Sequence, residues 1–451
     1  MNCLSKGEKM QLDKDNKNWI GKLPESWNTR KIKYVLWQRN EDNLPIKSKK
    51  ILSLTAKQGV IPYEEKVGGG NKPKQNFSAY KLAYPGDIVM NSMNILSGAV
   101  GLSKYKGCVS PVYYMLRPIS KADDVRFFYY VFANKAFQHS LLGIGNGILI
   151  KKSDKGTYNT IRMRIPIEKL KNLVIPYPSA EEQRSIADFL DKKCADIDKL
   201  STQIQKEIDT LQKYRKSVIT KIVTKGLDDT VPMKESGIEW IGKIPETWKL
   251  EKIKFLTSKI QKGLSPQYQD KGKTNIITQA TFSKGYWDES SLKKAITSHR
   301  DEKLNLVKKH DILLATTGGG VLGKTYFIKK DINYVASADV VFIRGNDKRI
   351  INKLIYYCLF INYNLLNGIM AQGSTNQLHL NVNNLKNFKL PVGSIDVQQR
   401  IVNYLDNKTS QIDKIISQKQ KQLSLLSDYK NSLIFEYVTG KKQISSNGGE
   451  K

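Results

Sequence analysis

Two long stretches of the chain carry apolar residues at the seven-residue spacing of a coiled coil. In the first stretch the repeating residues are Leu190, Ile197, Ile204, Leu211 and Val218. The intervening spacing of three or four is filled by Cys194, Leu200, Ile208, Tyr214 and Ile222. The second stretch repeats the pattern at Leu405, Ile412, Leu426 and Leu433, with Lys419 in the place of Ile204. The pattern predicts two long α-helices, each with an apolar stripe that needs a partner.

Both predicted helices have recognisable ends. Ser179 followed by Glu182 is a capping-box signature for the first helix, and Gly226 marks its end. Ser394 and Gly440 hold the same places in the second helix. A helix of roughly 45 residues is on the order of 65 to 70 Å long. The alternative, that each helix packs only on its own domain, is disfavoured by this length and by polar faces such as 192–199, so we expect the helices to pack together.

The chain contains one unit of sequence twice. WIGKLPESWNTRKIK at 19–33 returns as WIGKIPETWKLEKIK at 240–254, an offset of 221 residues with ten of fifteen positions identical. IADFLDKKCADIDKL at 186–200 returns as IVNYLDNKTSQIDKI at 401–415, an offset of 215. The residues between these conserved ends are only faintly alike. A duplicated frame with unlike middles favours two different recognition surfaces, and a pseudo-two-fold relation between the copies would make the helices antiparallel.

The stretch ahead of each helix predicts an α+β domain. Short β-rich runs such as 86–91, 111–118 and 311–317 alternate with glycine loops and helical segments at 123–137 and 348–366. The fold class is therefore α+β, with two domains separated by two antiparallel coiled-coil helices. The predicted limits are 1–178 for the first domain with an N-terminal extension, 179–226 for the first helix, 227–393 for a linker and the second domain, 394–441 for the second helix, and 442–451 for a C-terminal tail.

Charge indicates a polyanionic partner. The 74 Lys and Arg residues exceed the 42 Asp and Glu residues, which leaves a net charge of +32. Nucleic acid is the usual target of such a surface. The four cysteines and four histidines form no metal-binding or disulfide pattern, and we expect no metal. No membrane span or signal peptide is predicted, which makes the cytoplasm the expected location.

One motif has the form of a phosphate-binding loop. Gly318-x-x-x-x-Gly323-Lys324-Thr325 matches the pattern, but strand-like residues follow it where a helix is required. In the corresponding segment of the first copy, 95–105, Gly-Lys-Thr is replaced by Gly101-Leu102-Ser103, so the lysine of the motif is absent. We therefore interpret 318–325 as a tight loop between strands, and find no catalytic constellation.

These features together resemble the specificity subunit of Type I restriction-modification systems. The resemblance rests on the paired openings Trp19–Trp27 and Trp240–Trp248, on the lead-ins around Gln183 and Gln398, and on the paired helices, and it covers nearly the whole chain. It implies a non-catalytic subunit whose two target-recognition domains each bind half of a bipartite double-stranded DNA target. It also implies that the helices bind two methyltransferase subunits and that motor-nuclease subunits complete the assembly. No cofactor would bind this chain, since S-adenosylmethionine, ATP and Mg would belong to the partners.

Candidate DNA-contacting residues combine amide, hydroxyl and basic groups beside glycine. They are Lys57, Gln58, Asn91, Asn94, Asn146, Lys151 and Lys152 in the first domain, and Gln279, Lys284, Ser374, Thr375, Asn376 and Gln377 in the second. For any single one of these residues, the alternative of an ordinary polar turn is favoured over a DNA contact. We expect the four paired tryptophans to pack the domains against helix ends, whereas Tyr214 and Tyr429 could contact a partner or fill the helix interface. Two other functions stay open at this point: a P-loop ATPase or nuclease acting on DNA, and a nonspecific nucleic-acid scaffold.

Overall fold

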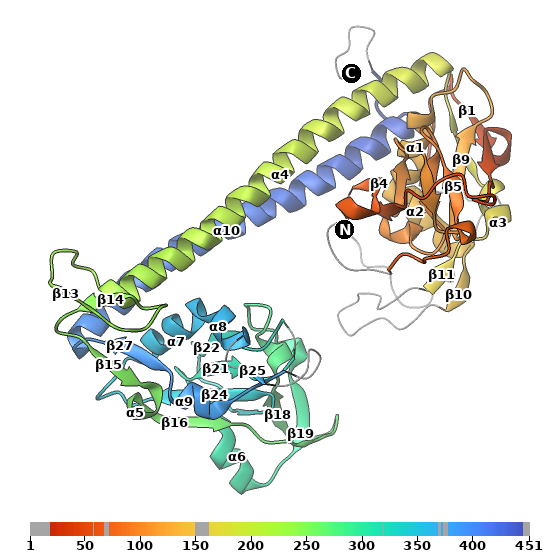
Figure 1. Cartoon of the computed structure of the whole chain (residues 1–451). Helices are drawn as coiled ribbons and strands as arrows, with labels where there is room; N and C mark the ends of the chain where they lie inside the picture. The colour runs from red at the N-terminus through yellow and green to blue at the C-terminus, as the bar shows by residue number, and fades with distance from the viewer. Residues whose placement is uncertain are drawn as a thin grey trace. The chain divides into compact units, whose positions relative to one another are not determined.

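The computed structural model describes residues 19–56, 58–66, 72–148, 162–318, 320–368, 371–372 and 378–444. The chain forms two compact units, Met1–Ile204 with Lys421–Lys451, and Gln205–Gln420. The two predicted long helices are confirmed as α4 (Ala180–Lys225) and α10 (Ile395–Val438). The limits of the two units fall inside these helices, so each unit contains one domain and a part of both helices (Figure 1).

The first domain is built on a four-stranded antiparallel sheet. Its order is β2 (Leu36–Arg39), β9 (Tyr113–Pro118), β6 (Ile88–Asn91) and β7 (Val100–Leu102). The apolar helix α1 (Val125–Ala133) shares a core with this sheet, in which Phe127 and Phe128 are fully buried. Its remaining elements are β1 (Asn28–Lys31) paired with β12 (Val174–Tyr177), β3 (Leu52–Thr55) with β4 (Gly59–Pro62), β5 (Lys81–Ala83) with β8 (Gly107–Val109), β10 (Asn146–Ile148) with β11 (Arg162–Arg164), α2 (Lys135–Ser140) and α3 (Ile167–Lys171).

The second domain repeats this sheet in the same order. The strands are β16 (Thr257–Lys262), β24 (Val340–Gly345), β21 (Ile312–Ala315) and β22 (Thr325–Phe327). Further matching elements are β15 (Lys249–Lys252) paired with β27 (Lys389–Val392), α7 (Asn352–Ile361) and α9 (Val382–Lys386). The predicted α+β class is therefore confirmed, and the duplication seen in the conserved ends extends to strand order.

The second domain also has elements with a different arrangement. A five-stranded mixed sheet has the order β17 (Gln267–Tyr268), β19 (Lys293–Ile296), β18 (Thr274–Ile277), β23 (Tyr334–Ala336) and β20 (Leu306–Val307). The other elements of the second domain and linker are β13 (Met233–Glu235), β14 (Lys243–Pro245), α5 (Ile253–Leu256), α6 (His299–Asn305), α8 (Tyr363–Gly368), β25 (Ala371–Gln372) and β26 (His379–Leu380). The dissimilar sequences between the conserved ends of each copy thus form different structure, although both copies share the four-stranded sheet and the long helices.

The paired tryptophans pack as predicted. Trp19 and Trp27 are buried with the C-terminal turns of α10, where Leu433 and Tyr437 belong to the same core. Trp248 is buried with the C-terminal turns of α4, and Trp240 stacks on Phe388 with ring centroids 5.5 Å apart. Each conserved opening therefore holds the end of one long helix against a domain.

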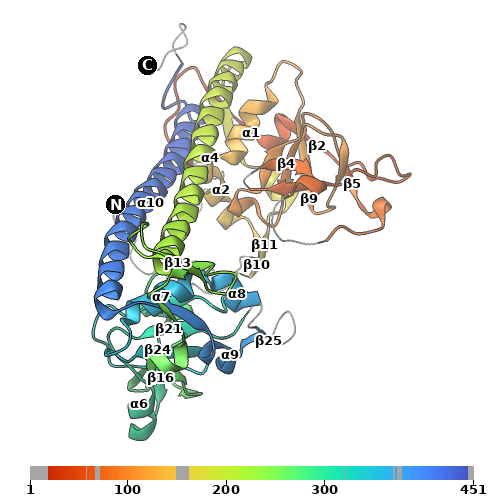
Figure 2. The same ribbon diagram turned by 60° about the vertical axis from the view of Figure 1, so that its left-hand side comes forward.

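Within each unit α4 and α10 lie side by side and antiparallel (Figure 2). In the first unit Lys430 Nζ lies 2.6 Å from Asp198 Oδ1. In the second unit Arg215 Nε lies 3.1 Å from Asp413 Oδ1, and Lys419 forms an ion pair with Glu207. The first and second of these pairs are equivalent, because the 215-residue offset converts Asp198 to Asp413 and Arg215 to Lys430. Lys419, which interrupts the apolar pattern, is thus matched by a carboxylate on α4.

The predicted apolar stripe is only partly correct. Leu190, Ile197, Ile204, Leu405, Ile412 and Leu433 are buried, whereas Leu211, Val218 and Leu426 are half-buried. Leu200 and Tyr214 were wrongly assigned to it, because they are 45% and 48% exposed. The second column of the stripe runs through Cys194, Ser201, Ile208, Arg215 and Ile222, and a residue one position earlier points about 100° away. Tyr429 is also 48% exposed, so neither tyrosine fills the helix interface.

Candidate nucleic-acid interface

The phosphate-loop motif lies in the connection between β21 and β22. These strands are antiparallel neighbours, and Thr325 is the first residue of β22 rather than of a helix. The N–H group of Gly323 donates to Ala315 O at 2.9 Å, which closes the loop on itself. Gly318 and Gly323 have φ values of 87° and 88°, a conformation that glycine adopts without strain. The interpretation as a tight loop between strands is confirmed, because the strand β22, and not the helix that a phosphate-binding loop requires, follows the motif in the chain.

Gln279 lies directly beside this loop. Thr317 Oγ1 donates to Gln279 Oε1 at 3.2 Å, and the Gln279 N–H donates to Asp339 Oδ2 at 3.1 Å. A Cβ atom added to Gly318 would lie 3.6 Å from Gln279 Nε2. The structure therefore fixes the carboxamide of a predicted DNA-contacting residue against the glycine-rich loop.

A third segment joins the same cluster. Gly318 N–H donates to Leu378 O at 3.2 Å, and Leu380 N–H donates to Thr316 O at 2.9 Å. Leu378 directly follows the predicted contact residues Ser374, Thr375, Asn376 and Gln377, which lie outside the described residues. The chain leaving that predicted segment is thus tied to the loop that holds Gln279.

Basic and aromatic side chains line a cavity at the C-terminal end of the loop. Lys284 and Lys324 border a space of about 270 Å³ together with Phe282, Phe360 and Tyr363. Lys284 forms an ion pair with Asp288 at 3.0 Å. Within the part of the chain that the structure describes, Lys324 forms no ion pair. Cations beside aromatic rings suit the phosphates and flat faces of a nucleic acid.

The first domain has an equivalent pair of loops. Gln58 is exposed in the turn between β3 and β4, where its N–H donates to Thr55 Oγ1 at 2.9 Å. Asn94 is exposed in the loop between β6 and β7. The two loops lie close together, since a Cβ atom on Gly98 in the β6–β7 loop would lie 3.8 Å from Ala56 Cβ in the β3–β4 turn. Lys57 lies outside the described residues.

Two other predicted residues of the first domain lie elsewhere or face inward. Asn91 is 9% exposed, and its Oδ1 accepts the Met93 N–H at 3.0 Å, so its side chain shapes the loop. Asn146 is exposed on β10, and its Oδ1 accepts Lys169 Nζ at 3.0 Å. Lys151 and Lys152 lie outside the described residues.

The structure therefore gathers the candidates at matching places. The β6–β7 loop and the β21–β22 loop occupy the same position in sheets of the same strand order. Gln58 and Asn94 belong to the first of these clusters, and Gln279 and Lys284 to the second. Sequence reasoning missed Thr317, whose hydroxyl orients Gln279. The only signal for it was the glycine-rich motif that begins one residue later.

Other chemistry finds no support among the described residues. In the described ranges no cluster of three or more His, Cys, Asp or Glu side chains could hold a metal ion. None of the described helices combines the length and apolarity needed to span a membrane.

Comparison with known proteins defines the class. Residues 24–210 and 245–425 match the family described as Type I restriction modification DNA specificity domain, and the chain belongs to this family. Its function is that of a DNA sequence-specificity subunit, and subunits of this class are not themselves enzymes.

Individual relatives agree with this assignment. The Type I restriction enzyme MjaVIII specificity subunit of Methanocaldococcus jannaschii is 26% identical over 80% of this chain and 81% of its own length. The putative MjaX specificity subunit of the same organism is 24% identical over 95% of this chain and 97% of its own length. A chain from a structural study of complex assembly in a type I system superimposes with a TM-score of 0.65 at 13% identity, over 92% of this chain and 98% of that one, which shows a shared fold.

Proposed function

We propose that this subunit recognises an interrupted, asymmetric double-stranded DNA target, with one half bound by each domain. The observation that carries the proposal is the pair of equivalent loop clusters, which share a frame but differ in sequence. Gln279, Thr317 and Lys284 form one cluster, and Gln58 with Asn94 forms the other. Different side chains at the same place would read different bases, so the two halves of the target should differ.

Recognition combines contacts to phosphates, which position the protein on the DNA, with contacts to base edges, which select the sequence. The net charge of +32 supplies salt-dependent attraction to phosphates, and Lys324 is well placed to contribute. Amide side chains such as Gln279 then contact base edges in the major groove. The chain directs two methyltransferase subunits and motor-nuclease subunits to the bound site, in the cytoplasm. S-adenosylmethionine, ATP and Mg are bound by those partners, and this chain binds none of them.

The alternatives from the sequence differ in what they need. A P-loop ATPase needs a strand-to-helix turn at Lys324, whereas the loop connects two antiparallel strands. A nonspecific scaffold needs no second domain of different design. Neither has an observation in its favour.

The decisive experiment is to express the chain with its methyltransferase partner in a host without adenine methylation and to map methylated adenines. We expect one interrupted motif with unlike halves, which disappears when this chain is omitted. Methylation without a motif, from an assembled complex, would contradict the proposal.

A further inference from the structure

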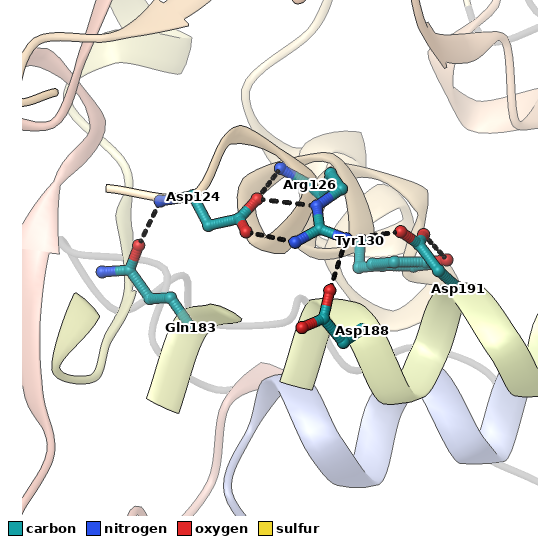
Figure 3. A network of polar contacts seen from close by, with 6 residues as sticks. All are labelled: Asp124, Arg126, Tyr130, Gln183, Asp188 and Asp191. Atoms are coloured by element: carbon teal, nitrogen blue, oxygen red, sulfur yellow. Dashed lines mark hydrogen bonds and ion pairs between the residues drawn. The ribbon is translucent and has the colours of Figure 1, made fainter. Parts of the chain in front are cut away.

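A polar network joins the first domain to the start of α4 (Figure 3). Arg126 on α1 donates from Nη1 to Asp188 Oδ1 at 2.7 Å and to Asp191 Oδ2 at 2.9 Å, both on α4. Its Nη2 also donates to Asp124 Oδ2 at 2.6 Å. Tyr130 Oη donates to Asp191 Oδ1 at 2.7 Å. The domain and the helix are thus connected by charge-assisted hydrogen bonds, which are the strong ones.

A buried glutamine completes the network. Gln183 in the first turns of α4 is fully buried, and its Oε1 accepts the Asp124 N–H at 3.0 Å. Its Nε2 donates to Pro178 O at 3.1 Å and to Asp123 Oδ1 at 3.2 Å. Gln183 therefore connects the start of α1 to the start of α4.

The second unit contains the same network. Lys353 on α7 donates to Asp406 Oδ2 at 2.6 Å, and Tyr357 Oη donates to Asp406 Oδ1 at 2.5 Å. Gln398 is 1% exposed, accepts the Ile351 N–H at 2.9 Å, and donates to Gly393 O at 3.0 Å. An offset of 227 residues converts Arg126 to Lys353 and Tyr130 to Tyr357, and the helix offset of 215 converts Gln183 to Gln398 and Asp191 to Asp406.

The repetition points to a role other than base recognition. The domains differ in their middles and in the residues of their loop clusters, yet four side-chain roles recur at the junction with the long helix. We call these residues the clamp: Arg126, Tyr130, Gln183 and Asp191 in the first unit, and Lys353, Tyr357, Gln398 and Asp406 in the second. A requirement for stability alone could be met by any apolar contact, whereas directional hydrogen bonds fix an orientation.

We propose that the clamp residues are positioning residues that set the number of base pairs between the two half-sites. They fix the orientation of each domain on its own long helix, so they determine where its loop cluster meets the DNA without contacting a base. The proposal rests on the proposed function, because it presupposes an interrupted target.

The two clamps differ in a way that supplies its own control. Arg126 forms ion pairs with three carboxylates, whereas among the described residues Lys353 forms an ion pair with Asp406 alone. Arg126→Lys therefore gives the first clamp the same cation as the second. If the clamp works by orientation and not by guanidinium chemistry, this conservative variant should keep the correct spacing.

The test uses the full chain assembled with its methyltransferase partner and maps methylated adenines for each variant. In the double variant Arg126→Gln with Tyr130→Phe, we expect both half-sites to keep their bases. Methylation at sites with one base pair more or fewer between them should rise about tenfold relative to correctly spaced sites, as expected for loss of a charge-assisted hydrogen bond. The single variant Arg126→Lys should keep the spacing of the unaltered chain.

A matched control is Tyr114→Phe, which removes a buried hydroxyl that donates to Ile165 O at 2.9 Å inside the same domain. It should yield no misspaced sites. An even loss of methylation in the double variant, with no misspaced sites, would overturn the inference and leave the clamp a purely structural contact. If the double variant does not fold, Tyr357→Phe removes a single hydroxyl of the second clamp. It should likewise increase methylation at misspaced sites, and an even loss of methylation without misspaced sites would again overturn the inference. A wild-type chain that yields no interrupted motif would instead refute the proposed function.

Discussion

The carboxamide of Gln279 is held in a definite orientation by its neighbours. Thr317 Oγ1 occupies one lone pair of Oε1, and the backbone N–H of Gln279 is held by Asp339. A carbonyl oxygen has a second lone pair, so Oε1 can still accept one hydrogen bond while the Nε2 hydrogens donate. Adenine offers the complementary pair, N6–H and N7, in the major groove. Gln279 is therefore equipped to select adenine.

Replacing Gln279 by alanine should relax one base position in one half-site. A bidentate amide contact discriminates by about 1 to 3 kcal/mol, so methylation of targets with another base at that position should rise about 5- to 150-fold. The measurement is the methylated motif of the assembled complex. Gln261→Ala is the matched control, because the Gln261 amide donates to Asn305 Oδ1 at 2.7 Å inside the same domain. A motif that stays intact in the Gln279 variant would remove this residue from recognition.

Residue type alone could not separate contact residues from turn residues. Gln279 and Lys284 were selected because they place an amide and a cation near glycine, and the structure brings both to the loop cluster. Asn91 satisfied the same criterion but uses its side-chain oxygen for the Met93 N–H. Thr317 could not be recognised, since its role depends on Gln279, which is distant in sequence. The sequence reports polarity, whereas the structure reports which hydrogen-bonding capacity is already used.

The ends of α4 and α10 show how a helix stop also serves packing. Gly226 follows the last residue of α4 with φ of 83°, and Gly440 lies just beyond α10 with φ of 67°. Sequence analysis located both, because glycine beyond an apolar pattern predicts a left-handed helix stop. What it could not show is the contact. A Cβ atom on Gly440 would lie 2.5 Å from Pro24 Cδ, whereas one on Gly242, which has the same φ, would meet nothing within 4 Å.

This pair of glycines separates backbone strain from crowding. Gly242→Ala should destabilise the fold by about 1 kcal/mol, the cost of a left-handed alanine. Gly440→Ala should lower the free energy of unfolding by about 1 to 3 kcal/mol more than Gly242→Ala does, because the rigid proline ring must move. Denaturant unfolding of the two variants checks the difference. Equal losses of stability would show that the Pro24 contact relaxes without cost.

In both domains of the chain, the first and the last strand pair with each other. β1 pairs with β12 in the first domain and β15 with β27 in the second, so both ends of each domain lie together on neighbouring strands. The repeat predicted this frame because its ends are similar in both copies. The five-stranded sheet of the second domain was not predicted, because the middles diverge and its strands are only two to four residues long. The segment between the conserved ends can therefore change the bases that a domain recognises, while the paired strands, the long helices and the clamp stay the same.

A chain in which 249–392 replaces 28–177 should therefore recognise a symmetric target. The exchanged segment begins and ends at equivalent residues, since the offsets of 221 and 215 relate its two limits. Its Lys353 and Tyr357 would meet Asp191 of α4 in place of Arg126 and Tyr130. The repeat exchanges the two helices of an antiparallel pair, so we expect two identical half-sites in inverted orientation. The methylation map of the assembled complex is the measurement.

The reciprocal chain, with 28–177 in place of 249–392, is the matched control. It should recognise a target made of two copies of the half-site that the first domain binds. The methylated motif of each chimera should therefore be an inverted repeat of one half of the natural motif, a different half for each chimera. Half-sites in direct orientation would contradict the pseudo-two-fold relation that the repeated sequence predicts. An unchanged asymmetric motif from either chimera would show that base recognition lies outside the exchanged segments, and would leave the loop clusters around Gln58 and Gln279 without a role in the choice of target.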